Sequence, residues 1–348
     1  MNHKLGIIGY GGMGHLHHHF SPMVDGLDVV AAYDIDRSRV NLAENLGLRP
    51  YFKLEDILND SDLDIILVAT PNDSHKELSI AALQAGKHVI CEKPVTTNSS
   101  DLKEIIKVAK KAQRQFSVHQ NRRWDKDFLT VKKVLDEGVI GKPFYVESRV
   151  QGSRGIPGDW RRIKASGGGM MFDWGVHLLD QMMSMINSPV MEVYAHIFNV
   201  NYPEVDDNLK IMLKFDNNIS ALLEVDTFCL INLPRWQILG SEGTMQLKNW
   251  ECEGQILLGS VQEVDWNEIS QTAAGPTRTM APIKPEMIKE IPIPVVNSDI
   301  GAFYVNYLSA LEGREELIVK PEQALRVLRV IEAAFLSSTK GVCVKGPF

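Results

Sequence analysis

The segment LGIIGYGGMG, residues 5–14, decides the fold of the first half of this chain, because a short apolar run leads directly into a glycine-rich turn. Its glycines fit the pattern G-x-G-x-x-G, and an acidic residue, Asp34, lies 20 positions after Gly14. In such a loop Gly9 allows the tight turn, Gly11 lets the backbone approach a pyrophosphate, and Gly14 lets the next helix pack closely against the strand. The segment therefore predicts a dinucleotide-binding site.

The residues that follow this turn predict how the dinucleotide is held. Gly12 and Met13 begin the helix, where free amide N–H groups face a phosphate. Asp34 ends the next apolar run, where its carboxylate can accept hydrogen bonds from the ribose hydroxyls and repel a 2′-phosphate. We therefore expect NAD in preference to NADP, although Arg37 lies close enough in sequence to accommodate the phosphate of NADP.

Short apolar runs alternate with helix-like stretches from this motif to about His119, as expected for a parallel, doubly wound sheet covered by helices on both faces. The predicted strands are Leu5–Ile8, Val29–Tyr33, Ile65–Ala69, His88–Cys91 and Phe116–His119. The predicted helices between them are Asp36–Leu46, Ser74–Ala85 and Ser99–Ala112. We expect an N-terminal Rossmann domain over residues 1–123.

The pattern changes after Trp124, and residues 124–348 are expected to form a substrate-binding and oligomerisation domain. Turn residues at 216–218 and 240–243 predict hairpins, so this second α/β domain should contain a large, mostly antiparallel sheet. Its predicted strands are 144–151, 190–200, 209–215, 220–227, 236–239 and 244–247, and its predicted helices are about 127–137, 170–185, 300–311 and 321–338. Residues 267–285 are expected to form a surface loop.

Composition excludes several classes of protein. A chain of 348 residues is long enough for two domains, and 44% hydrophobic with 23% charged residues is typical of a globular protein. The net charge of −7, without a basic run, argues against nucleic acid or an anionic membrane as a partner. Four separated cysteines, the absence of a long apolar run and an N-terminus that runs straight into a strand predict a cytoplasmic protein.

Four histidines on the first predicted helix, His15, His17, His18 and His19, raise the possibility of a metal site. On a helix they point in different directions, and no carboxylate lies nearby in sequence. We therefore expect no metal there, and place these histidines at the helix end or on the domain surface.

Two further segments carry residues suited to catalysis. Lys93 follows the fourth predicted strand, where ligands bind in doubly wound sheets, and the next residue is a proline whose peptide bond could be cis. Asp173 and His177 are four positions apart in a glycine-rich segment, so an α-helix would place them on one face and in contact. A carboxylate beside an imidazole orients it and raises its basicity; Asp180, three positions further on, is the alternative partner.

Together these segments resemble the Gfo/Idh/MocA oxidoreductase family over nearly the whole chain. The motifs that carry the resemblance are the glycine loop, Ala69-Thr70-Pro71-Asn72 with His75, Glu92-Lys93-Pro94, Asn121-Arg122-Arg123-Trp124-Asp125, and the helix with Asp173 and His177. The resemblance implies a Rossmann domain followed by an α/β domain, often assembled into homodimers or homotetramers through the large sheet. It also implies that Lys93, Asp173 and His177 are the catalytic residues.

The resemblance extends to the cofactor and the substrate. It implies that Thr70, Pro71, Asn72, His75, Glu92, Lys93 and Asn121 line the cofactor site. The run Arg122-Arg123-Trp124-Asp125 has the form found in the polyol and inositol dehydrogenases of the family, which makes Arg123 a candidate substrate-binding residue. Trp160 and Arg161 could meet the C–H groups and hydroxyls of a sugar.

The expected reaction is hydride transfer between a secondary alcohol of a sugar, glycoside or cyclic polyol and the nicotinamide. The alcohol proton needs a base and the developing charge a positive neighbour, so His177 is assigned as base and Lys93 as the orienting cation. These two roles could be exchanged. Two alternatives stay open: an NAD-dependent glycosidase that acts by transient oxidation and elimination, and a non-catalytic NAD-binding sensor.

Overall fold

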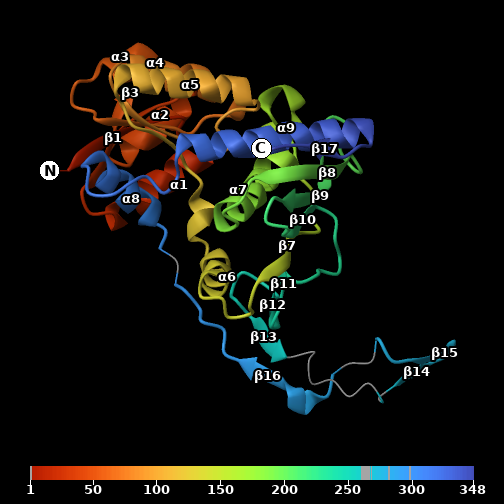
Figure 1. Ribbon diagram of the computed structural model, residues 1–348. Helices are drawn as coiled ribbons and strands as arrows, with labels where there is room; N and C mark the ends of the chain where they lie inside the picture. Colours follow the sequence, from red (N-terminus) through yellow and green to blue (C-terminus); the bar gives the residue numbers. More distant parts are fainter. Residues whose placement is uncertain (1, 260–266, 268, 281–282, 298) are drawn as a thin grey trace.

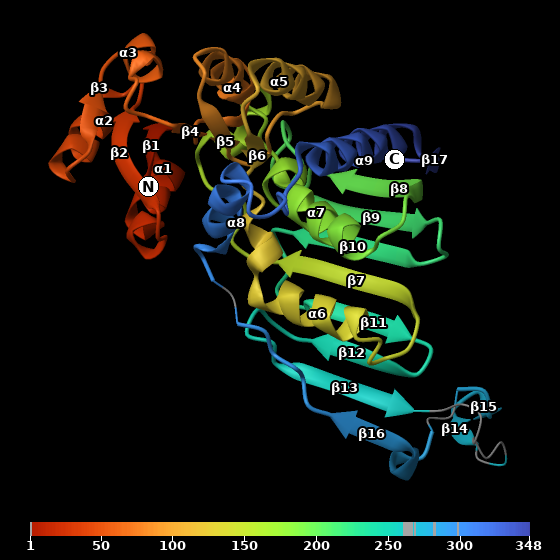
Figure 2. The same cartoon turned by 60° about the vertical axis from the view of Figure 1, so that its left-hand side comes forward.

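A computed structural model describes residues 2–259, 267, 269–280, 283–297 and 299–348. Two sheets organise the chain, a parallel one near the N-terminus and a larger, mostly antiparallel one formed by the rest (Figures 1 and 2). This arrangement confirms the expected α/β class. Among the described residues, no helix is long and apolar enough to cross a membrane.

The parallel sheet has six strands in the order β3-β2-β1-β4-β5-β6. The strands are β1 (His3–Ile8), β2 (Leu27–Tyr33), β3 (Arg49–Tyr51), β4 (Ile65–Val68), β5 (His88–Cys91) and β6 (Phe116–Val118). The helices between them are α1 (Gly12–Phe20), α2 (Arg37–Asn45), α3 (Leu54–Asn59), α4 (His75–Gln84) and α5 (Ser99–Ala112). Every residue of β4 is buried, as expected for a strand covered on both faces. The five expected strands are present, while β3 and α3 were not anticipated.

The second sheet has nine strands in the order β16-β13-β12-β11-β7-β10-β9-β8-β17, and only the pair β7 and β10 is parallel. The strands are β7 (Pro143–Gln151), β8 (Val190–Phe198), β9 (Asn208–Phe215), β10 (Ser220–Asp226), β11 (Trp236–Gly240), β12 (Gly243–Leu247), β13 (Gly254–Gly259), β16 (Ile288–Ile291) and β17 (Val344–Lys345). Helices α6 (Lys126–Asp136) and α7 (Val176–Met185) lie over one face of this sheet (Figure 2). The mostly antiparallel sheet was therefore predicted correctly.

The segment expected to be a surface loop, 267–285, contains a small hairpin of β14 (Ser270–Thr272) and β15 (Gly275–Thr277). It lies away from both sheets in Figures 1 and 2. Residues 268, 281 and 282 of the expected loop lie outside the described residues.

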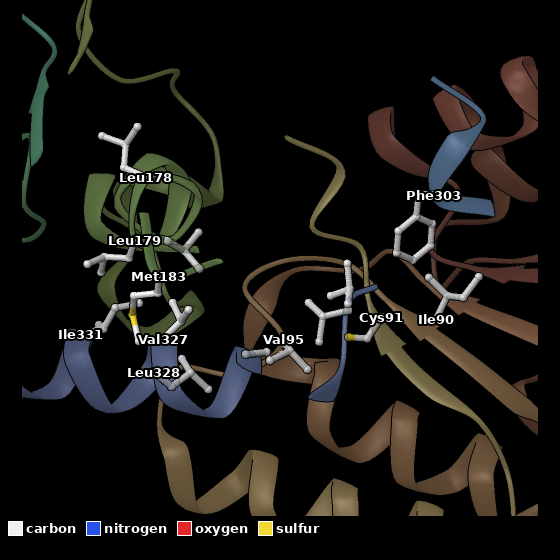
Figure 3. Packing of buried hydrophobic residues seen from close by; sticks show 14 of the residues in the cluster. Ile90, Cys91, Val95, Leu178, Leu179, Met183, Phe303, Val327, Leu328 and Ile331 are labelled. Atoms are coloured by element: carbon white, nitrogen blue, oxygen red, sulfur yellow. The ribbon is translucent and has the colours of Figure 1, made fainter. Parts of the chain in front are cut away.

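Two C-terminal helices, α8 (Ala302–Leu311) and α9 (Pro321–Lys340), join the two halves. The Ser99 amide and hydroxyl, at the start of α5, donate to the Glu332 carboxylate of α9 at 2.6 and 2.9 Å. Apolar side chains of α7 and α9 pack against each other, as Figure 3 shows for Leu179, Met183, Val327 and Leu328. The helices assigned by sequence to the second half thus also support the first, and they bring α8 beside α1.

Candidate active site

The glycine loop has the shape that a pyrophosphate requires. Gly9 has φ +96°, and a Cβ there would lie 2.7 Å from the carbonyl oxygen of Ala69. A Cβ on Gly14 would lie 2.2 Å from the carbonyl oxygen of Gly9, so the start of α1 packs directly on the loop. At Gly12, by contrast, a Cβ would meet nothing within 4 Å. The loop is therefore tight where it packs and open at the exposed helix start, which fits a phosphate held by amide groups.

Asp34 lies immediately after β2 and is almost fully buried. Its carboxylate accepts hydrogen bonds from the backbone N–H groups of Tyr10, at 2.7 Å, and Asp36, at 2.9 Å. The basic residue beside it is Arg39, whose Nη1 lies 3.5 Å from Asp34 Oδ2. Arg37, the residue expected from sequence, is exposed and lies over the Phe52 ring instead, with 6.0 Å between its guanidinium carbon and the ring centroid.

The residues that follow β4 were all expected to line the cofactor site, but two of them make hydrogen bonds within the protein. Asn72 donates its side-chain N–H to the carbonyl oxygen of Gly167 at 2.9 Å, which ties this loop to the glycine-rich segment of the second half. His75 is fully buried, with its ring nitrogens 2.9 and 2.8 Å from the carbonyl oxygens of Pro94 and Thr70. We predicted that His75 contacts the cofactor; its ring is instead occupied by backbone groups. Pro71 is exposed and Thr70 half-buried, so both stay predicted cofactor contacts.

Lys93 projects from the turn after β5 to the second half of the chain. Its ammonium lies 3.1 Å from Asp173 Oδ1 and donates to the Asp173 carbonyl oxygen at 3.0 Å. The other carboxylate oxygen of Asp173 lies 3.4 Å from Nε of Arg161. Burial opposes the ionisation of Asp173, but the charges and hydrogen bonds of Lys93 and Arg161 hold its pKa below its usual value. The Lys93–Pro94 bond is cis.

His177 lies close to this ion pair but is not bonded to Asp173, which corrects the expected contact. Residues 171–175 form a π-helical turn before α7, so the spacing of four does not align the two side chains as in an α-helix. Asp180, the alternative partner, instead binds Arg123 through two bonds of 2.7 Å. Among the described residues, Nδ1 of His177 has no hydrogen-bond partner.

The surroundings of His177 decide the direction of its pKa shift, which the sequence left open. We expected Asp173 to raise its pKa and Lys93 to lower it. Burial, followed by the positive charges of Lys93 and Arg122, lowers the pKa of His177 well below its usual value. The lowered pKa favours the neutral imidazole at physiological pH, the form that can accept a proton.

Arg123, the expected substrate-binding residue, is instead part of the protein's interior, and its neighbour Arg122 lies at the aromatic side chains of the site. Arg123 is buried, and besides Asp180 it binds Gln323 and the carbonyl oxygen of Ile318, so its guanidinium joins the halves and is not available to substrate. The guanidinium carbon of Arg122 lies 4.1 Å from the centre of the Trp174 ring.

Trp250 is a residue of the site that the sequence did not predict. Its ring lies 5.8 Å from that of Trp174 between centroids, and 5.4 Å from the guanidinium carbon of Arg122. Trp250 follows β12, and no motif in its neighbourhood could have revealed its position.

Trp160 and Arg161 form the remaining part of the predicted substrate site. They lie in a 3₁₀ turn, Trp160–Arg162, in which the Asp159 carboxylate accepts a hydrogen bond from the backbone N–H of Arg161. The guanidinium carbon of Arg161 lies 4.7 Å from the centre of the Trp160 ring. Because Arg161 also contacts Asp173, the structure brings it to the candidate catalytic residues, and Trp160 lies beside it.

A separate cavity of about 530 Å³ is lined by residues that include Gly167, Phe172, Asp206 and Phe335. Neither Lys93 nor His177 lines it, so we do not place the substrate there.

The histidines of α1 differ in their surroundings. His15 and His19 are exposed, as expected, but His17 is buried and its Nε2 donates to Glu92 Oε1 at 2.8 Å. No carboxylate lies near them in sequence, but the fold brings Glu92, 75 positions away, to His17, which is therefore not on the domain surface as expected.

Comparisons with known proteins agree with this architecture. Residues 3–120 match the model of an oxidoreductase family with an NAD-binding Rossmann fold, and residues 128–246 match the GFO/IDH/MocA C-terminal domain. The chain is 42% identical to an NAD-binding protein from Listeria innocua of known structure, with a TM-score of 0.95 and 99% of both chains covered. It is 29% identical to scyllo-inositol 2-dehydrogenase (NADP(+)) of Bacillus subtilis, over 96% of this chain and 93% of that protein. It is also 31% identical to myo-inositol 2-dehydrogenase of Thermotoga maritima, over 55% of this chain and 57% of that protein.

Proposed function

The chain belongs to the Gfo/Idh/MocA family of oxidoreductases, and we propose that it is an NAD-dependent dehydrogenase acting on a secondary alcohol of a sugar, glycoside or cyclic polyol. The observation that carries this proposal is the buried, neutral His177 beside the Lys93–Asp173 ion pair. A neutral imidazole and a fixed ammonium are the base and the cation that alcohol oxidation needs.

In this mechanism His177 accepts the hydroxyl proton of the substrate. Lys93 donates a hydrogen bond to the same oxygen and stabilises the negative charge that develops there. Asp173 keeps Lys93 in place, since it binds the ammonium through both its carboxylate and its carbonyl oxygen. The nicotinamide of bound NAD supplies the hydride acceptor.

The surroundings of these residues favour a hydroxylated ring as substrate. The rings of Trp174 and Trp160 offer apolar faces for C–H groups, while Arg122 and Arg161 offer hydrogen-bond donors for hydroxyls. Two of the similar proteins named above are inositol dehydrogenases, which supports a cyclic polyol.

The test is absorbance at 340 nm with NAD and a panel of inositols, aldoses and glycosides. We expect NADH to accumulate with at least one of them, and replacement of His177 by alanine to abolish this. Release of free sugar from a glycoside without net NADH would replace the proposal by the glycosidase mechanism. NAD binding without turnover of any member of the panel would contradict the proposal.

We also propose that two copies of the chain associate through the face of the large sheet that α6 and α7 leave open. Tyr194 and Met212 are paired neighbours on β8 and β9 and are 50% and 38% exposed, and Leu222 of β10 continues the row. Exposed apolar rows of this kind mark interaction surfaces. Light scattering should show a dimer or tetramer that Met212→Lys weakens; a monomer at micromolar concentration would contradict this.

A further inference from the structure

A second group of titratable side chains lies directly behind Lys93 and has no place in the mechanism above. Glu92 is buried, and its Oε1 accepts hydrogen bonds from His17 Nε2 and His119 Nδ1, both at 2.8 Å. Its other oxygen, Oε2, accepts from the backbone N–H of Lys93 at 3.1 Å. The carboxylate therefore connects two histidines to the backbone of Lys93.

The direction of these hydrogen bonds follows from the groups at the far end. The hydroxyl of Tyr304 lies 2.6 Å from His17 Nδ1. Burial raises the pKa of Tyr304 well above its usual value and lowers that of His17, so a neutral tyrosine donates to a neutral imidazole. The single proton of the His17 ring then lies on Nε2 and points to Glu92. Burial opposes the ionisation of Glu92, but the histidines hold its pKa well below its usual value.

The four side chains come from separate parts of the fold. His17 lies on α1, whose first residues form the predicted phosphate site, while Tyr304 lies on α8 near the other end of the chain. His119 directly follows β6 and also packs its ring against Phe303, with 4.6 Å between centroids. We call His17, His119 and Tyr304 the histidine clamp.

We propose that Glu92 is a positioning residue, through which the histidine clamp couples the phosphate-binding helix α1 and the C-terminal helix α8 to Lys93. The proposal rests on the proposed function, because it assigns Lys93 its place at the substrate. Two consecutive hydrogen bonds connect α1 to the Lys93 backbone: one between His17 and Glu92, and one between Glu92 and the Lys93 N–H. Phosphate binding at the start of α1 would thereby act on the backbone that positions the Lys93 ammonium.

The same three side chains, His17, Glu92 and His119, offer metal-ligating atoms within 4.8 Å of one another. Nitrogen and carboxylate ligands are those that Zn²⁺ prefers. The geometry favours hydrogen bonds, since both rings can donate to one oxygen at ordinary distances and Tyr304 fixes the proton of His17 on the side of Glu92. A metal is therefore the competing outcome of the test.

Tyr304→Phe tests the proposal with a minimal change, and Tyr307→Phe is the matched control. Tyr307 is buried on the same helix but contacts the carbonyl oxygen of Gln115, outside the histidine clamp. Without the Tyr304 hydroxyl, Nδ1 of His17 loses its donor and the link from α8 to His17 is broken, while the Nε2–H group still donates to Glu92. We expect Tyr304→Phe to lower kcat about three- to tenfold, the effect of one hydrogen bond, with an unchanged KM for the alcohol. Tyr307→Phe should leave both constants unchanged.

The ¹⁵N spectrum of the histidine rings gives a readout that needs no substrate. His17 should be the neutral Nε2–H form in all three proteins, and the signal of its Nδ1 should shift in Tyr304→Phe, where Nδ1 loses its donor, but not in Tyr307→Phe. Saturating NAD should shift the His17 and His119 signals. If no alcohol is oxidised but these spectra behave as stated, the dehydrogenase proposal fails while the coupling stands.

Three results would overturn the coupling. The first is a His17 signal that responds neither to Tyr304→Phe nor to NAD. The second is an equal loss of kcat in both tyrosine variants. The third is stoichiometric Zn²⁺ bound by the purified protein and lost in Glu92→Gln, which would make the three side chains a metal site.

Discussion

Two glycines of the same loop should respond differently to the same substitution. Gly12→Ala adds a methyl group where the chain has open space, whereas Gly14→Ala adds it 2.2 Å from the carbonyl oxygen of Gly9. Both residues lie in the first turn of α1. If Gly12→Ala weakens NAD binding, the cause must be a clash between the new methyl group and the bound NAD. If Gly14→Ala weakens it, distortion of the protein itself contributes.

The magnitudes follow from these distances. Ordinary contact begins near 3.4 Å, so Gly14→Ala requires a displacement of the helix start by roughly 1 Å, and overpacking of this kind costs about 1–3 kcal/mol. Alanine is favoured over glycine in a helix by up to about 1 kcal/mol, so Gly12→Ala should leave the free energy of unfolding unchanged or raise it. If the pyrophosphate lies against the amides of this turn, the Gly12 methyl should weaken NAD binding at least tenfold, or about 1.4 kcal/mol.

The assay is a fluorescence titration with NAD, alongside thermal unfolding without NAD. We expect Gly12→Ala to keep the melting temperature and lose affinity, and Gly14→Ala to lose both. Normal NAD affinity in a stable Gly12→Ala protein would refute the placement of the phosphates at the start of α1.

The remaining predictions concern cofactor choice and catalysis. Asp34→Ser should narrow the preference for NAD over NADP in paired titrations, because it removes the charge that repels a 2′-phosphate; an unchanged ratio would locate the discrimination elsewhere. His177→Ala and Lys93→Ala should each lower kcat about a hundredfold or more in steady-state assays at pH 7.5, while NAD affinity survives in the His177 variant; near-normal turnover in both would show that the chemistry lies elsewhere. Oxidation should increase with pH through the pKa of His177, which is lowered, so in a profile of kcat against pH this limb should lie below pH 6.5, with the opposite limb for ketone reduction. Asp173→Asn should reduce kcat as Lys93→Ala does and leave the pH of that limb nearly unchanged. A limb centred above pH 6.5, or one that moves by a full pH unit in Asp173→Asn, would instead indicate a direct contact between Asp173 and His177.

The parallel half of the fold was predictable because its signals are local. A buried strand such as β4 is a continuous apolar run, and a glycine such as Gly9 is required by the sign of its own φ and by the next few atoms. The elements that were missed lack such signals. β3 (Arg49–Tyr51) has three residues, none of them fully buried, and β16 (Ile288–Ile291) contains two charged positions in four.

The candidate site was predicted as a set of residues but not as a set of contacts. Lys93, Asp173 and Arg161 do meet, yet the expected pair of Asp173 and His177 assumed an α-helix where the chain forms a π-helical turn. Sequence spacing gives a contact only if the type of helix is known. The same limit applies to Arg122 and Arg123. Which of the two guanidinium groups faces inward depends on distant partners such as Asp180, which lies 57 positions from Arg123.

Burial decides which of these contacts matter for chemistry. A carboxylate four positions away would have made His177 more basic, but Asp173 is already neutralised by two cations, and the ring is left among positive charges. Conversely Glu92, which the resemblance placed only among the cofactor residues, is the acid held between two histidines and bonded to the Lys93 backbone. The carboxylates of this site have thus taken different partners from those expected: Asp173 holds the head of the lysine, and Glu92 holds its backbone. Lys93 is fixed at both ends, whereas the buried His177 ring has no hydrogen bond to Asp173 and a pKa lowered towards the neutral form. That difference supports His177 as the group that gains and loses the proton, and Lys93 as the charge that stays in place.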